Sequence, residues 1–129
     1  MKKKVLLISE SAAGGLRKHL VQIIDDLDRE KFDVYFIHGI GTKDREFDRR
    51  YSDLKKECTI IVCKYFARNL DPIKDFYTLL FLIKQIRNIK PDIVHCHSSK
   101  AGVLGRIAAK ICGVKKIIYT PHAYAFLAD

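Results

Sequence analysis

The sequence contains no tryptophan and few residues that break regular structure, with three prolines and seven glycines among 129 positions. The sequence likewise shows no low-complexity tract and no internal repeat. Long apolar runs are also missing: the run 79–83 has five residues, whereas a membrane-spanning helix needs about 18. The apolar segment 5–8 is followed by Ser9 and Glu10. We therefore interpret it as a buried strand and not as the core of a signal peptide.

The cysteines lack the spacing of a zinc site or of a disulfide framework. They number four, at positions 58, 63, 96 and 112, and no two of them form a C-x-x-C pair. This usage is typical of reduced thiols in the cytoplasm. We therefore expect a cytoplasmic protein.

Acidic residues are in the minority, since fifteen Asp and Glu stand against twenty-four Lys and Arg for a net charge of +9. A surface of this charge favours anionic partners, which include nucleic acids, phosphorylated ligands and acidic membrane faces. A hydrophobic content of 48% is typical of a folded chain. Because 129 residues bury one sizeable core and no linker divides them, we expect a single domain over residues 1–129.

Short apolar segments alternate with amphipathic ones along the chain. The apolar segments predict strands at 5–8, at 34–37 (ended by Gly39 and Gly41), at 59–62, from 93 toward 97, and at 116–120. Helical spacing of apolar residues predicts helices at 16–27, in part of 43–56, at 73–89 with Asp71 and Pro72 at its start, and at 101–112. The helix 73–89 is too apolar for one buried stripe, and we expect Phe81 and Leu82 to extend onto an exposed edge that meets a partner domain or a membrane interface.

This alternation predicts an α/β fold, a Rossmann-like doubly wound parallel sheet of about five strands with helices on both faces. Such sheets bind ligands beyond the carboxyl ends of the strands, where the strand order reverses. With the common order 3-2-1-4-5, this point lies between the first and the fourth strand. Polar or glycine-rich segments directly after these two strands are therefore the candidates for a binding site.

A glycine pair, Gly14 and Gly15, follows the first strand. Glycines let the backbone approach a ligand closely, and the helix behind them begins with free N–H groups. Arg17 and Lys18 lie near the first turn, where positive charge opposes the helix dipole unless an anion binds. The alternative is a plain glycine turn with two solvated bases, because the full G-x-G-x-x-G motif is absent.

A polar segment of His97, Ser98, Ser99 and Lys100 follows the fourth strand. Either serine can cap the next helix, and Lys100 again places a positive charge in a first turn. The alternative is an ordinary capped helix with a surface lysine. Since this segment and the glycine pair meet at one point of the sheet, together they indicate a phosphate-bearing or polyhydroxylated ligand.

Histidines supply the remaining candidates. A zinc site at His95, Cys96 and His97 is disfavoured because alternate residues of a strand point to opposite faces. His122 follows the fifth strand at the same edge and could donate to a substrate oxygen or transfer a proton. His19 could face the crevice from the first helix, or it could be a surface residue.

The chain resembles the N-terminal domain of glycosyltransferase family 4 enzymes from about residue 5 to residue 126. The resemblance is carried by the segments 91–102 (PDIVHCHSSKAG), Gly105-Arg106 and 113–122 (GVKKIIYTPH), and by Gly14-Gly15 followed by His19-Leu20. It implies one half of a GT-B fold, in which this domain receives the acceptor and a second domain binds the nucleotide-sugar donor. It also implies hexose transfer with retention of configuration from a UDP- or GDP-linked sugar, without a metal or other cofactor.

The resemblance assigns roles to the residues found above. Gly14 and Gly15 match the loop near the donor diphosphate, and His122 matches a histidine beside the transferred sugar. His19, His97, Ser98, Ser99 and Lys100 fall on the acceptor side. Ala123 stands where many relatives carry glycine. The implied products are capsular, exopolysaccharide or other cell-surface glycans, built on glycan or lipid-linked acceptors at the inner face of the cell membrane.

The carboxylate pair E-x7-E and the donor-binding bases of the family belong to the second domain. We therefore expect the 129 residues to be inactive alone and to need that domain or a partner subunit. The alternative function is a non-catalytic subunit of a split transferase that scaffolds or docks on an anionic membrane. A stand-alone dinucleotide-binding module is disfavoured because no acidic ribose partner follows the second strand, and we expect no nucleic-acid partner.

Overall fold

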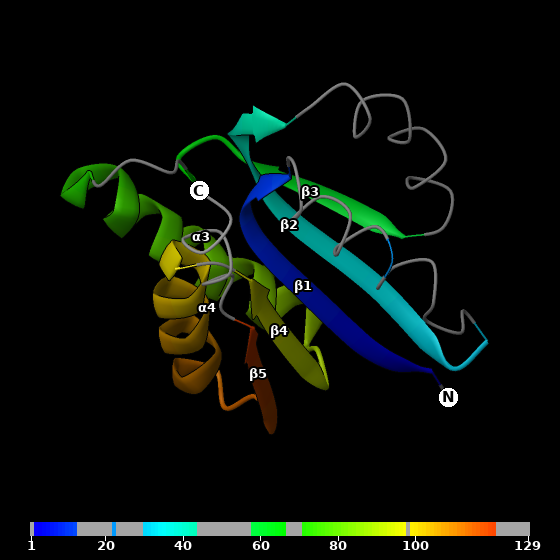
Figure 1. Ribbon diagram of the computed structural model, residues 1–129. Coiled ribbons are helices and arrows are strands. Elements are labelled where there is room, and N and C mark those ends of the chain that lie inside the picture. Colours follow the sequence, from blue (N-terminus) through cyan, green and yellow to red (C-terminus); the bar gives the residue numbers. More distant parts are fainter. Residues whose placement is uncertain are drawn as a thin grey trace.

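A computed structural model describes residues 2–12, 22, 30–43, 58–66, 71–97 and 99–120. Five parallel strands form one sheet in the order β3-β2-β1-β4-β5, which confirms the expected topology (Figure 1). The strands are β1 (Lys3–Ala12), β2 (Phe32–Lys43), β3 (Thr59–Cys63), β4 (Ile93–His97) and β5 (Lys116–Thr120). The described helices are α3 (Pro72–Ile89) and α4 (Ser99–Ile111).

The first and fourth strands are neighbours at the centre of the sheet. Val5 of β1 pairs with Val34 of β2 on one side and with Ile93 of β4 on the other. The strand order therefore reverses between β1 and β4, as expected for a doubly wound sheet. The two helices α3 and α4 pack side by side on one face. Of the helix predicted at 16–27 the structure describes residue 22 alone, and this residue is helical. Residues 44–56, where a further helix is predicted in part, lie outside the described residues.

The glycines of the second strand do not end it. β2 continues to Lys43 through Gly39 and Gly41, so the prediction that it ends there was wrong. The register between β1 and β2 shifts beyond Ser9, where Ser9 pairs with His38 but Ser11 pairs with Thr42. Glycine inside a strand often accompanies such an irregularity, and here it allows both strands to extend past the shift.

The core lies between the sheet and the layer of α3 and α4. Leu6 and Ile8 of β1 are fully buried there against Leu82 and Ile86 of α3. Leu7, between them, is equally buried but points to the other face. Burial on both faces explains why this strand is a continuous aliphatic run.

The third helix begins and ends at residues that cap it. The Asp71 carboxylate accepts a hydrogen bond from the backbone N–H of Lys74 at 3.1 Å, and Pro72 follows it. At the other end Lys90 adopts a left-handed conformation with φ of 54° and donates its N–H to the Ile86 carbonyl at 2.8 Å. Pro91 then prevents continuation. Both predicted ends of this helix are confirmed.

The prediction of its exposed edge was wrong in detail. Leu82 is fully buried and Phe81 is half-buried, because Leu82 falls on the stripe of Thr78, Ile86 and Ile89 that faces the sheet. The exposed apolar side chains lie instead on the opposite stripe, nearer the start of the helix. None of the helices in the described part of the chain is long and apolar enough to cross a membrane.

Two glycines let the fourth helix pack closely on the sheet. A Cβ atom at Gly102 would collide with the Tyr119 ring, and one at Gly105 would lie 2.5 Å from the Cys96 sulfur. Both β4 and β5 therefore contact the helix backbone directly. Ala108 and Ala109 continue this close-packed side, where both are fully buried.

Candidate functional site

The carboxyl ends of β1, β4 and β5 meet at one edge of the sheet. Ser9 of β1 pairs with His97 of β4, which in turn pairs with Thr120 of β5. Ser9 and His97 are both fully buried. This edge is the point of reversed strand order where doubly wound sheets bind their ligands.

Two histidine rings lie together on one face of β4. The ring centroids of His95 and His97 are 4.0 Å apart. The His95 Nε2 atom and the Thr120 hydroxyl lie 2.7 Å apart in a hydrogen bond. His95 is therefore a structural residue that joins β4 to the end of β5. His97 is fully buried beside His95, so its side chain is not exposed to solvent in this structure. A role for His97 toward an acceptor stays a prediction.

Cys96 points to the opposite face, against α4. Burial raises the pKa of its thiol to about 12, and the nearby Arg106 offsets this only in part. A thiol of this kind stays protonated and is a poor ligand and nucleophile. The strand geometry thus separates Cys96 from the two histidines. Across the described residues, no three or more His, Cys, Asp or Glu side chains are grouped so that they could hold a metal ion.

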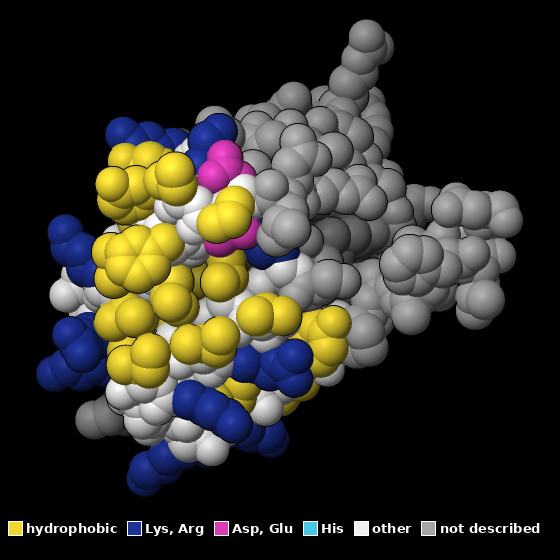
Figure 2. Space-filling model, turned by 90° about the vertical axis from the view of Figure 1, so that its left-hand side faces the viewer, with side chains coloured by type: hydrophobic (Ala, Val, Ile, Leu, Met, Phe, Trp, Pro, Cys, Tyr) yellow, Lys and Arg dark blue, Asp and Glu magenta, His cyan; other side chains and the backbone are white. Residues whose placement is uncertain are grey.

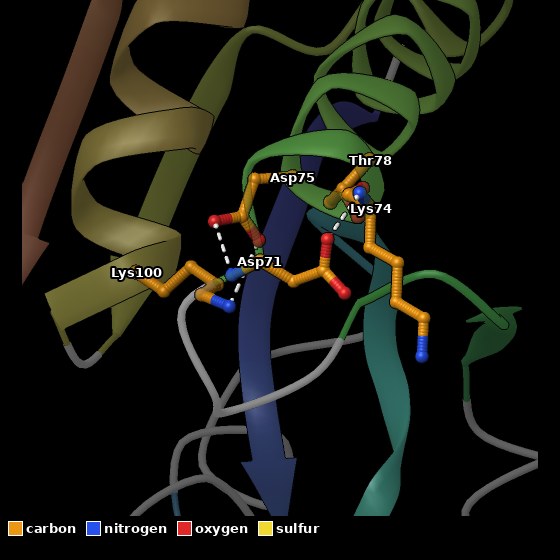
Figure 3. Close-up of polar contacts among 5 residues, drawn as sticks. All are labelled: Asp71, Lys74, Asp75, Thr78 and Lys100. Carbon is orange, nitrogen blue, oxygen red and sulfur yellow. Dashed lines mark hydrogen bonds and ion pairs between the residues drawn. The ribbon is translucent and has the colours of Figure 1, made fainter.

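The charge of Lys100 is balanced by a carboxylate of the neighbouring helix. Its Nζ atom lies 2.8 Å from Oδ1 of Asp75, and the two side chains are only 11% and 16% exposed. Figure 3 shows Lys100 reaching from the first turn of α4 to the first turn of α3. The Asp71 backbone N–H lies 3.4 Å from the other Asp75 oxygen, which connects the ion pair to the cap of α3.

This ion pair changes the interpretation of Lys100. The sequence suggested that a lysine in a first turn needs an anion, and Asp75 supplies one from within the chain. Sequence reasoning missed Asp75 because the pair joins two helices that are separated by a strand. The pair holds the starts of α3 and α4 together directly behind the end of β4. Contact of Lys100 with an acceptor stays a prediction.

The structure describes only part of the predicted site. Ser99 is the first residue of α4, two residues before the predicted start at 101, and its side chain is not described. Outside the described residues lie Gly14, Gly15, His19, Ser98 and His122. Their proximity to His97 is therefore a prediction that follows from the strand order.

A hollow of about 430 Å³ lies at the opposite edge of the sheet. It is formed where α3 ends and where β5 is about to begin, and it is lined among others by Lys90, Asp92, Gly113 and Lys115. These residues precede β4 and β5, so the hollow is on the amino side. It does not contain the predicted site, which we place at the carboxyl edge because doubly wound sheets bind their ligands where the strand order reverses.

Solved structures share this fold. A crystal structure of a UDP-N-acetylglucosamine 2-epimerase superimposes with a TM-score of 0.62 and 17% identity, over 93% of this chain and 33% of that one. The Methanocaldococcus jannaschii UDP-GlcNAc 2-epimerase gives 0.61 and 15%, over 93% and 31%. At this identity the likeness shows the fold alone. The chain is thus an α/β domain of the doubly wound, Rossmann-like class.

Sequence comparison identifies the family. Residues 13–127 match the profile of Glycosyltransferase Family 4, and the chain belongs to this family. The match covers most of the chain, including the segments after β1, β4 and β5. The predicted resemblance is therefore confirmed.

Two relatives come from bacteria. The chain is 35% identical over 112 residues to the Escherichia coli UDP-Gal:alpha-D-GlcNAc-diphosphoundecaprenol alpha-1,3-galactosyltransferase, a match covering 87% of this chain and 27% of that protein. It is 38% identical over 67 residues to an uncharacterized 41.2 kDa protein in the cps region of Klebsiella pneumoniae, covering 49% and 18%. The chain thus spans about a quarter of the length of the first relative.

Proposed function

We propose that this chain is the acceptor-side domain of a retaining glycosyltransferase that transfers a hexose from a nucleotide sugar to a lipid-linked acceptor. The observation that carries the proposal is the 35% identity to the Escherichia coli galactosyltransferase, which extends over 87% of the chain. The match in the cps region of Klebsiella pneumoniae supports a role in cell-surface polysaccharide synthesis. The reaction would take place at the cytoplasmic face of the membrane.

The relative suggests the substrates to test first. Its donor is UDP-Gal and its acceptor is a GlcNAc-diphosphoundecaprenol. UDP-galactose carries its sugar in the α configuration, so an alpha-linked product is what retention gives. UDP-galactose is therefore the first donor to test, before GDP-linked sugars, and a diphosphate-linked lipid is the first acceptor, before a free glycan.

The proposed roles of the residues follow the strand ends. Gly14 and Gly15 would lie at the donor diphosphate, where their lack of side chains permits close backbone approach. His122 would orient hydroxyls of the transferred sugar or stabilise developing charge. His19, His97, Ser98, Ser99 and Lys100 would form the acceptor side. We propose no metal or other cofactor, and the carboxylates and bases for donor binding would come from a second domain or subunit.

The test is an assay of the longest product that the gene encodes. The enzyme would be incubated with UDP-galactose, UDP-glucose or GDP-mannose and a short-chain lipid diphosphate carrying GlcNAc, and products would be analysed by mass spectrometry and by NMR of the new anomeric proton. We expect an alpha-galactoside, formed equally well with a metal chelator present. His122→Ala should reduce turnover about a hundredfold, while Lys116→Ala, an exposed lysine at the start of β5, should not change it. The proposal would be refuted if the enzyme transferred no sugar from any of these UDP- and GDP-linked donors.

A second candidate is a non-catalytic subunit that docks or scaffolds a separate donor-binding chain. The observation in its favour is the set of large apolar side chains exposed on α3 and α4. The same assay separates the two candidates. A gene product that binds lipid vesicles but transfers sugar only after a second chain is added would favour the subunit.

A further inference from the structure

Large apolar side chains are exposed on the outer side of the α3–α4 layer. On α3 they form a stripe at helical spacing, and on α4 they recur every fourth residue. They are Ile73, Phe76, Tyr77 and Leu80 on α3 and Val103, Ile107 and Ile111 on α4, each between 42% and 70% exposed. Figure 2 shows hydrophobic side chains gathered over this side of the molecule, with Lys and Arg around them. We refer to these seven residues as the outer apolar face.

Positive charge borders the outer apolar face. The stripe of α3 continues from Leu80 into Lys84 and Arg87, both exposed. On α4, Lys110 is exposed between Ile107 and Ile111. The one carboxylate in the sequences of α3 and α4 is Asp75, and its charge is taken up by Lys100. Asp71, the cap of α3, is a further carboxylate at the start of this helix, and Figure 2 shows acidic side chains beside one part of the apolar patch. From Leu80 onward on α3, and along α4, the two helices present apolar and cationic groups outward.

The geometry points to an anionic lipid surface as the partner of the outer apolar face. Apolar side chains flanked by cations are the pattern of helices that lie in the plane of a membrane interface, where anionic lipid attracts the bases. Aromatic rings favour this depth, and the Phe76 and Tyr77 rings are adjacent, with centroids 6.4 Å apart. A protein partner of this charge would need an acidic rim, and a second copy of this chain would oppose base to base.

The position of the face relative to the site adds a consequence. Asp75 lies between Ile73 and Phe76, and it contacts Lys100, the third residue after the end of β4. The start of the outer apolar face is therefore next to the carboxyl edge where we place the acceptor. Docking through this face would bring that edge to the bilayer that holds a lipid-linked acceptor, and this consequence rests on the proposed function.

Vesicle sedimentation tests the docking directly. The longest gene product would be mixed with vesicles of equal parts phosphatidylglycerol and phosphatidylcholine, or of phosphatidylcholine alone. We expect binding to the anionic vesicles that falls with added salt. Phe76→Glu with Leu80→Glu should reduce the partition coefficient about a hundredfold, and Lys84→Gln with Arg87→Gln about tenfold. Val62→Glu is the matched control for Leu80→Glu alone, because it places one negative charge on a 42% exposed apolar residue of β3 outside the face.

Three outcomes would overturn the inference. The first is equal binding of the wild type to both vesicle types. The second is a loss of binding in Val62→Glu as large as that in Phe76→Glu/Leu80→Glu. The third is a wild type that does not bind vesicles but forms a dimer in light scattering, where Phe76→Glu/Leu80→Glu abolishes the dimer. Thermal unfolding of each variant checks that it is folded. Sugar transfer to a detergent-dispersed short-chain acceptor separates the two proposals. A variant that no longer docks on vesicles should keep this transfer activity. If the wild type itself transfers no sugar, the proposed transferase function is refuted, while the docking result stands.

Discussion

The inner and outer sides of the α3–α4 layer are similar in chemistry and opposite in exposure. Leu82 and Ile86 on the inner side are buried against β1, while Leu80 and Phe76 on the outer side are about half exposed. Burial of an apolar side chain in the core stabilises the fold by roughly 1.5–3 kcal/mol. The same side chain on the outer side contributes little until a partner covers it. The inner side thus explains stability, and the outer side is available for binding.

A pair of matched leucines gives the largest expected difference between the two sides. Leu82→Ala removes a fully buried side chain and should lower the free energy of unfolding by about 3 kcal/mol, because it leaves a cavity. Leu80→Ala removes the same atoms from a 46% exposed position and should cost less than about 0.5 kcal/mol. Urea denaturation measures both. Equal losses would mean that Leu80 is covered within this chain.

The ion pair between the helices should have the next largest effect. Asp75→Asn leaves the Lys100 ammonium, 11% exposed, without its counter-charge, and should destabilise the protein by about 2 kcal/mol, between the values for exposed and buried pairs. Lys100→Met combined with Asp75→Asn should recover part of this loss. A double-mutant cycle by urea denaturation measures the coupling. Lys74→Gln, an exposed charge of the same turn, is the control, and a coupling near zero would show that the pair is incidental.

Those features that depend on local sequence could be predicted. The continuous aliphatic run at Val5 predicted a strand buried on both faces, and Asp71 with Pro72 predicted the start of α3. Such signals act within a few residues and do not depend on the rest of the fold. The alternation of strands and helices then restricts the topology, because crossover connections have one hand. Within that restriction we took the order that is common in such sheets, and the structure confirms it.

Other features depend on what the fold brings together. Asp75 and Lys100 meet only because α3 and α4 lie side by side. Gly39 was interpreted as a strand end because a single sequence does not show that β1 shifts its register to accompany β2. Leu82 was assigned to the wrong side of α3, since a helix that is apolar all round has no unique buried stripe in its sequence. Within the candidate site, local signals indicated the edge of the sheet but not the internal partner of Lys100.

The titration of Cys96 reports how completely the inner side of α4 is buried from solvent. Burial raises the pKa of its thiol to about 12 from an ordinary value of 9.0. The folded state then holds this proton to higher pH than the unfolded state, so the contribution to stability is complete below pH 9 and is lost toward pH 12. Between pH 8 and pH 10 we expect about 1.4 kcal/mol of additional loss in the wild type compared with Cys96→Ala. Urea denaturation at both pH values gives the difference; parallel losses in the two proteins would contradict it.

The cap of α3 should have the smallest effect, and it acts on the outer side alone. Asp71 accepts from the Lys74 N–H and approaches Asp75 through its own backbone, so Asp71→Ala removes the contact that orders the first turn. We expect a loss of about 1 kcal/mol. The first turn carries Ile73 and precedes Phe76, whereas Leu82 and Ile86 lie more than two turns away.

Hydrogen exchange makes this difference between the two ends of α3 visible. In Asp71→Ala, amide protection should fall over the first turn and stay unchanged around Leu82 and Ile86, because tertiary packing holds that part of the helix. Asp71→Asn should keep most of the protection, since asparagine caps helices about as well as aspartate. A uniform loss of protection along α3 would mean that the inner and outer sides unfold as one unit. The outer apolar face would then owe its order to the core and not to its own cap.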